Sequence, residues 1–188
     1  MRRMLVIAVV ALACAASTLA GCKGLTAAPA SAGDWPAGVK EAEVYAAVLR
    51  RYLTTPAESS FSEHTFTTVY VLDNAVAGAG DPMGTPGPGT PIAENTQRQV
   101  TAALAGTADV VFIADRNTVV ENRDDCAQVK NGGILITFGP PKGDDNEVTV
   151  AVNGFVACLG ATWLTYVVRN EPGSGWRVAG TIGPAAIA

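Results

Sequence analysis

The C-terminal part of the chain repeats one pattern three times, and this pattern limits the fold more than any other feature of the sequence. Apolar and polar residues alternate, wholly or in part, over residues 147–156, 162–169 and 176–181. This period of two is typical of strands that bury one face. The segments between them are short, which suits hairpins and not the long crossover that parallel strands need. The sequence therefore predicts that the chain ends in an antiparallel β-meander.

Two segments nearer the N-terminus have the spacing of helices. Over residues 41–53 apolar side chains recur every four residues on one broad stripe, as in an amphipathic helix that buries one side. Pro56 should end this helix, because the residue before a proline disfavours helical geometry. A second helix is predicted over residues 92–105, with Gly106 in a left-handed cap. The residues expected to face inward from it are Val100, Ala103 and Leu104.

Further strands are predicted over residues 65–72, 110–114 and 134–138, which are rich in apolar and β-branched residues. Residues 73–91 contain repeated Gly and Pro, so we expect an irregular loop there, either mobile or functional. With helices early and strands late, the fold class is α+β. The expected architecture is two helices packed on a curved, mainly antiparallel sheet that ends in the meander.

The first 22 residues have the form of an export signal. Two arginines precede a short apolar run that is too short to span a membrane, and the run leads to Leu19-Ala20-Gly21-Cys22. These four residues resemble the lipobox of bacterial lipoproteins. The resemblance implies that Cys22 receives a diacylglycerol and becomes the first residue of the mature chain. It also implies a protein held on the extracytoplasmic face of the cell membrane by its lipid.

This interpretation divides the chain into three parts. Residues 1–21, which include Cys14, are the expected lipoprotein signal peptide, residues 22–40 a flexible tether rich in Ala, Gly, Pro and Ser, and residues 41–188 a single α+β domain. Cleavage leaves 167 of the 188 residues and removes two of 13 basic residues but none of 17 acidic ones. The resulting net charge of −6 argues against nucleic acid as a partner and against a basic membrane-binding patch.

Two cysteines remain besides Cys22, and outside the cytoplasm such a pair is expected to form a disulfide. Cys126 and Cys158 are 32 positions apart, and a bridge between them would stabilise the fold by about 3–4 kcal/mol in the chain-entropy model. A metal site is the alternative, but the neighbouring sequence lacks the further thiols or histidines of tetrahedral coordination.

No constellation of catalytic residues is evident, so we assign no catalytic residue, no metal and no cofactor. The acidic clusters at residues 124–125 and 144–147 could hold calcium, but their composition is that of solvated turns. The only histidine, His64, has an adjacent Glu63, but neighbours on a strand point to opposite faces. If the domain is an enzyme, His64, Asp73 and Tyr166 are the candidate residues.

The order of elements over residues 41–183 resembles that of cystatin-like and NTF2-like folds, in which a bent sheet holds a helix. The last stretch, "TWLTYVVRNEPGSGWRVAGTIG", is similar to the ends of many bacterial secreted proteins. These resemblances imply an architecture and not an activity. The leading hypothesis is a non-enzymatic domain that binds a protein, an envelope component or a small molecule. The alternatives are a small NTF2-like hydratase or isomerase and a structural role in the envelope.

Overall fold

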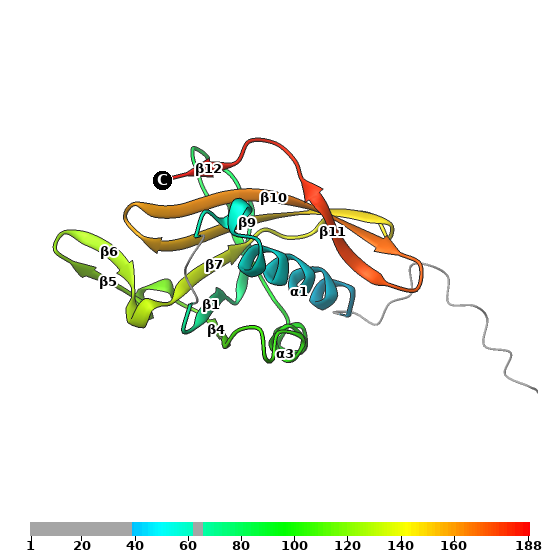
Figure 1. The fold of residues 1–188 in the computed structure, drawn as a ribbon, viewed down its shortest axis with the longest axis horizontal. Helices are drawn as coiled ribbons and strands as arrows, with labels where there is room; N and C mark the ends of the chain where they lie inside the picture. The colour runs from blue at the N-terminus through cyan, green and yellow to red at the C-terminus, as the bar shows by residue number, and fades with distance from the viewer. Residues whose placement is uncertain (1–38, 62–65) are drawn as a thin grey trace, which may run out of the picture. The chain divides into compact units, whose positions relative to one another are not determined.

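A computed structural model of the protein describes residues 39–61 and 66–188. The predicted signal peptide, most of the tether, Cys22 and His64 lie outside the described residues. The described part has the predicted α+β class, with three helices and a curled mixed sheet that forms a half-barrel (Figure 1). The sequence predicted two α-helices. The structure has an additional one of four residues, which directly follows the first.

The helices and strands of the described residues have the following bounds. The α-helices are α1 (Val39–Thr54), α2 (Pro56–Ser59) and α3 (Glu94–Ala103), and the 3-10 helices are η1 (Arg116–Thr118) and η2 (Lys130–Gly132). The strands are β1 (Val69–Leu72), β2 (Asn74–Val76), β3 (Gly89–Pro91), β4 (Val110–Ile113), β5 (Val120–Arg123), β6 (Cys126–Val129), β7 (Ile134–Phe138), β8 (Lys142–Gly143), β9 (Glu147–Ala157), β10 (Gly160–Glu171), β11 (Gly175–Thr181) and β12 (Ala186–Ile187).

The predicted meander is confirmed. The main sheet has the order β11-β10-β9-β7-β1-β4, and β9, β10 and β11 pair antiparallel in sequence order. In β9 every second residue is buried, beginning with Val148, so residues 148, 150 and 152 face the core and residues 149 and 151 lie on the outer face. The alternation of apolar and polar residues in the sequence thus determines which face of the meander packs against the core.

The sheet is mainly antiparallel, as expected, but it also has a parallel part that the sequence did not predict. Strand β1 pairs parallel with both of its neighbours, β4 and β7. Parallel neighbours need a long crossover, and between β1 and β4 the chain supplies one that contains α3. The sheet is consequently mixed, with a parallel part at one edge and the meander at the other.

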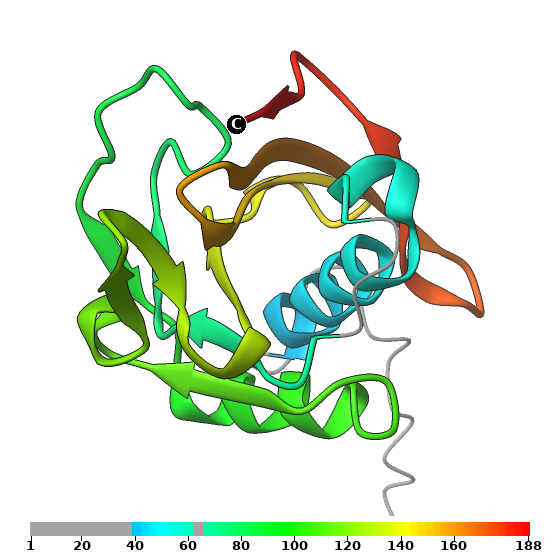
Figure 2. The ribbon, with the colours of Figure 1, turned by 60° about the vertical axis from the view of Figure 1, so that its left-hand side comes forward.

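Helix α1 lies within the curve of the sheet and fills it (Figure 2). Its stripe is fully buried, with Tyr45 and Tyr52 each 0% exposed. The Tyr45 ring stacks on Phe138 of β7, with ring centres 4.6 Å apart, and the Tyr52 hydroxyl hydrogen-bonds the Thr162 hydroxyl on β10. As predicted, this helix ends immediately before Thr55 and Pro56; Pro56 then opens α2, where its missing N–H costs nothing.

Several predicted boundaries are wrong. Strand β1 begins at Val69 and not at residue 65, and α3 spans Glu94–Ala103 with Ala103 exposed, not inward. The expected irregular loop contains a two-stranded sheet, since β2 and β3 pair across its base. Gly106 has the predicted left-handed conformation, with φ of 83°.

A hairpin that the sequence did not predict projects from the sheet next to β7. Strands β5 and β6 pair antiparallel, and the residues of its two-residue turn, Asp124 and Asp125, both have positive φ, as in the hairpin turns that match strand twist. Cys126 begins β6, and its sulfur lies 2.10 Å from that of Cys158 in the β9–β10 turn. The predicted cysteine pair is thus at disulfide distance and joins this hairpin to the meander.

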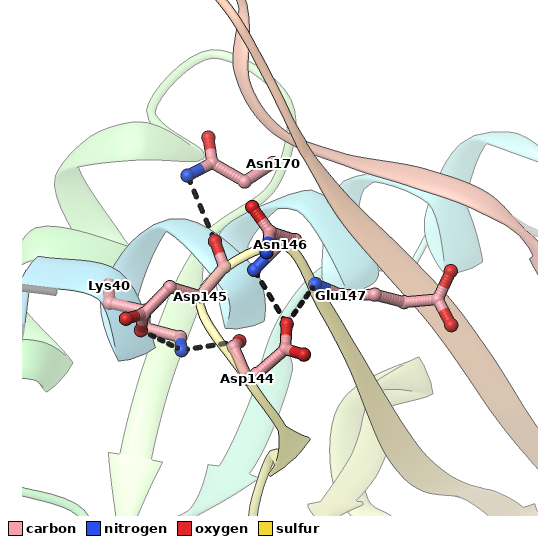
Figure 3. A network of polar contacts seen from close by, with 6 residues as sticks. All are labelled: Lys40, Asp144, Asp145, Asn146, Glu147 and Asn170. Atoms are coloured by element: carbon pink, nitrogen blue, oxygen red, sulfur yellow. Dashed lines mark hydrogen bonds and ion pairs between the residues drawn. The ribbon is translucent and has the colours of Figure 1, made fainter. Parts of the chain in front are cut away.

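Lys40, near the start of α1, binds the turn between β8 and β9 (Figure 3). Its ammonium group donates to the carbonyl oxygen of Asp144 at 2.7 Å and to Oδ1 of Asp145 at 2.9 Å. It also lies 5.0 Å from the centre of the Trp176 ring, within cation–π range. Lys40, which was assigned to the tether, therefore belongs to the folded part of the chain.

The acidic cluster at residues 144–147 is the tight turn between β8 and β9, as its composition predicted. Oδ1 of Asp144 accepts from the backbone N–H groups of Asn146 at 2.8 Å and Glu147 at 3.0 Å. These two donors, followed by the charge of Lys40, hold the pKa of Asp144 below its usual value. Asn170 Nδ2 donates to the carbonyl of Asp145 at 3.2 Å, which ties the turn to β10 (Figure 3).

Candidate functional site

Tyr166, one of the three candidate catalytic residues, lies on the inner face of β10 beneath α1 and α2. Its side chain is 0% exposed, and its hydroxyl has no hydrogen-bond partner among the described residues. Burial raises the pKa of Tyr166, and the charge of the nearby Glu58 raises it further. The two groups are close enough to interact electrostatically, but their geometry does not make a hydrogen bond. Tyr166 is therefore a neutral phenol at physiological pH.

Glu58 is held by an ion pair between α1 and α2. Nε of Arg51 donates to both carboxylate oxygens of Glu58, at 3.0 and 3.1 Å. These charge-assisted bonds are the main reason that the pKa of Glu58 is lowered. Tyr52 lies in the same region, and burial raises its pKa to about 12. The cluster thus contains the Glu58 carboxylate, which is paired with Arg51, and the phenols of Tyr52 and Tyr166, which stay protonated.

The structure does not assemble the predicted catalytic trio. Asp73 follows β1, whereas Tyr166 is on β10, and strands β7 and β9 lie between them in the sheet. The Asp73 carboxylate accepts from the side-chain amide of Asn74. His64 lies outside the described residues. The concave face, where an NTF2-like enzyme would hold its reacting groups, is occupied by the apolar side of α1.

A groove lies on the opposite, outer face of the sheet. Its volume is about 410 Å³, within the usual range of small-molecule sites. The floor consists of the outward side chains of Thr149 and Ala151 on β9 and Thr165 on β10. The walls are the start of the β2–β3 loop, the β7–β8 connection around Pro140, and the segment after β11.

Glycine makes the close approach of the loop to the sheet possible. A Cβ atom on Gly80 would lie 2.9 Å from the carbonyl oxygen of Leu164 and 2.9 Å from Oγ1 of Thr165. Only a residue without a side chain therefore lets the loop lie against the outer face of β10. Beyond this contact the loop turns outward: Oδ1 of Asp81 accepts from the N–H of Met83 at 2.9 Å, and Met83 is 92% exposed.

The groove has little charge and no aromatic side chain. Asp81 and Lys142 are the charged residues of its lining, and the hydroxyls of Thr149 and Thr165 are available on the floor, although Thr149 also donates to the carbonyl of Lys142 at 3.3 Å. Such a lining can orient a ligand through hydroxyl, amide and charged groups. Among its described lining residues there is neither a nucleophile with a neighbouring base nor a pair of carboxylates.

One wall of the groove comes from a segment that the sequence analysis singled out. The Gly- and Pro-rich segment at residues 73–91 was expected to be mobile or functional, and its first turn forms one wall of the groove. The small floor residue Ala151 and the opposite wall gave no signal, because an outward alanine or threonine in a strand has the same appearance at any exposed position. In the described chain no three His, Cys, Asp or Glu side chains gather as a metal site.

Comparisons of the chain with models of protein families, with curated proteins and with solved structures found no match. Within the described residues no helix has the length and apolar character needed to span a membrane.

Proposed function

We propose that this protein is a membrane-anchored extracytoplasmic bacterial lipoprotein whose domain binds an envelope component, a protein or a small molecule in the outer groove. The anchor is supported by the four lipobox residues that end at Cys22. Two or more acyl chains would hold the acidic domain at the membrane without any basic surface.

The observation that carries the binding role is the position of the concavity. The inner face of the half-barrel is packed by α1, with Val48 and Leu49 each 0% exposed. The groove of about 410 Å³ is instead on the outer face, beneath the Gly- and Pro-rich loop. A helix surrounded by a curved sheet also supports a cystatin-like or NTF2-like relationship, which we include in the proposal.

The anchor is tested by replacing its thiol. The Cys22→Ala variant should lose incorporated fatty acid and either leave the membrane fraction or accumulate as an uncleaved precursor. Cys14→Ala, which changes a cysteine eight positions earlier, is the matched control and should behave as wild type. Normal cleavage and unchanged membrane attachment of Cys22→Ala would contradict lipidation.

The groove is tested by filling it. Thr149→Trp places an indole on the floor, whereas Thr149→Ser keeps the hydroxyl and the space. Native mass spectrometry of protein extracted from membranes should show bound ligand on wild type and on Thr149→Ser but not on Thr149→Trp. Equal occupancy in all three proteins, or none in wild type, would refute binding at this position.

A further inference from the structure

Strand β4 ends the main sheet, and in the part of the chain that the structure describes it pairs only with β1 (Figure 1). The carbonyl of Asp109 accepts from the N–H of Val69 at 2.8 Å, and the carbonyl of Ile113 accepts from the N–H of Asp73 at 2.9 Å. Alternate residues of a parallel strand face the same neighbour. Residues 109, 111 and 113 therefore face β1, and the backbone N–H and C=O groups of residues 110 and 112 point to the open side.

A groove runs along this open edge. A hollow of about 640 Å³ lies between α3, at Gln97, Arg98 and Thr101, and the three residues 110–112 of β4. A second hollow of about 480 Å³ continues from Thr101 past the α3–β4 connection. The helix thus forms a wall beside open backbone donors and acceptors. Val111, 39% exposed, is the most exposed apolar residue of the strand.

The sequence of β4 gives this edge no protection. Edge strands of soluble proteins usually carry a lysine, a proline, a bulge or an inward charge that prevents pairing with other chains. Strand β4 reads Val-Val-Phe-Ile and pairs with β1 in unbroken register over all four residues. An apolar edge without these features is a surface suited to an added strand.

The charge around the edge indicates the partner. Asp109 precedes β4 and Asp115 follows it, and both are exposed. On the helix side, the Glu94 carboxylate lies 3.6 Å from the Arg98 guanidinium, so this pair neutralises itself. Arg116 follows Asp115, and its guanidinium lies 5.5 Å from the centre of the Phe155 ring. Each end of the edge thus carries an exposed carboxylate, and the two are six positions apart, which is about 20 Å in an extended chain.

We propose that the β4 edge binds an extended segment of a partner protein as an additional strand. The segment has an apolar centre and a basic residue at each end, opposite Asp109 and Asp115. The open backbone groups of residues 110 and 112 supply the hydrogen bonds, and the groove beside α3 receives the side chains that point toward the helix. This proposal is independent of the outer groove and of the lipid anchor.

The test uses the full chain in detergent and a labelled peptide, acetyl-Lys-Thr-Val-Thr-Val-Thr-Lys-amide, with binding measured by fluorescence anisotropy. Phe112→Pro removes an outward N–H without touching the bonds to β1, and Phe112→Ala, which loses the ring but keeps the N–H, is its matched control. We expect Phe112→Ala to bind and Phe112→Pro to bind about tenfold more weakly, the effect of one or two hydrogen bonds. Equal affinities of the two variants would overturn the proposal.

A second pair of measurements does not depend on how well the proline variant folds. The double variant Asp109→Asn/Asp115→Asn should weaken the lysine peptide severalfold and flatten its salt dependence, because two opposite-charge contacts are lost. A peptide with Glu in place of both Lys should bind wild type more weakly by a similar factor. The proposal is overturned if the lysine peptide does not bind wild type at about 1 mM, or if the Glu peptide binds equally well. It is also overturned if wild type self-associates and Phe112→Pro abolishes this, because a second copy of the chain then covers the edge.

Discussion

Tyr52 of α1 packs against Gly154 of β9 in the core, and Gly154→Ala is a direct test of that packing. A Cβ atom on Gly154 would lie 1.9 Å from the hydroxyl oxygen of Tyr52 and 2.6 Å from Cζ. The Tyr52 side chain is 0% exposed and its hydroxyl bonds Thr162, so the ring has no free space into which to turn. The added methyl group must therefore displace the ring, the helix or the strand.

The cost has two parts. Overpacking of a well-filled core costs about 1–3 kcal/mol. Displacement of the Tyr52 hydroxyl also breaks its bond to Thr162, which is 1% exposed, and loss of such a buried hydrogen bond costs about 1 kcal/mol. We therefore expect Gly154→Ala to lower the free energy of unfolding by about 2–4 kcal/mol.

The measurement is urea unfolding followed by tryptophan fluorescence, with the disulfide intact. Gly180→Ala is the matched control, because a Cβ atom on Gly180 of β11 meets nothing within 4 Å. This control should change stability by no more than about 0.5 kcal/mol. If Gly154→Ala also stays within that range, the reasoning from the close contact is refuted.

A double-mutant cycle separates the clash from the hydrogen bond. Tyr52→Phe alone should cost about 1–2 kcal/mol, because it leaves the Thr162 hydroxyl buried without its partner. In the Gly154→Ala background the same change should cost about 1 kcal/mol less, since the hydroxyl is already displaced and is the atom closest to the new methyl group. Strictly additive costs would show that residues 52 and 154 do not compete for the same space.

Three further predictions concern stability. Replacing both Cys126 and Cys158 by Ala should lower the free energy of unfolding by about 3–4 kcal/mol, because the bridge closes a loop of 32 residues; urea unfolding measures this, and an unchanged midpoint would argue against the bridge. Three tyrosines on α1 and β10 have raised pKa values in the fold, so the stability that they contribute is complete below about pH 10, where an unfolded tyrosine ionises. It should be lost above that pH by up to about 4 kcal/mol per pH unit, and urea midpoints that stay constant from pH 9 to 11 would contradict the burial of these phenols. Glu58→Gln should cost about 0.5–1 kcal/mol at pH 7. Because the pKa of Glu58 is lowered in the fold, its contribution is present above the ordinary carboxyl pKa, and the difference from wild type should vanish as the pH falls through the lowered value. A difference that is independent of pH would show that the ion pair with Arg51 does not stabilise α2.

The sequence by itself determined the features that depend on local periodicity. The four-residue spacing on α1, the helix stop at Pro56 and the alternation in β9, β10 and β11 are properties of neighbouring residues, and the structure has each of them. The pairing of Cys126 with Cys158 was also predictable, because once the leader is set aside only two cysteines besides Cys22 remain. The lipobox interpretation of Cys22 stays a prediction.

Only the tertiary structure decided which strands are neighbours and what faces what. A period of two states that a strand has two faces, but it does not place β1 between β4 and β7 in parallel, because that choice depends on where α3 packs. The outer groove exists because Gly80 lies against Thr165, 85 positions away in the chain. Tyr166 was predicted as a candidate residue, but its separation from Asp73 follows from the order of the strands and its confinement under α1 from the curl of the sheet. No short-range pattern encodes either.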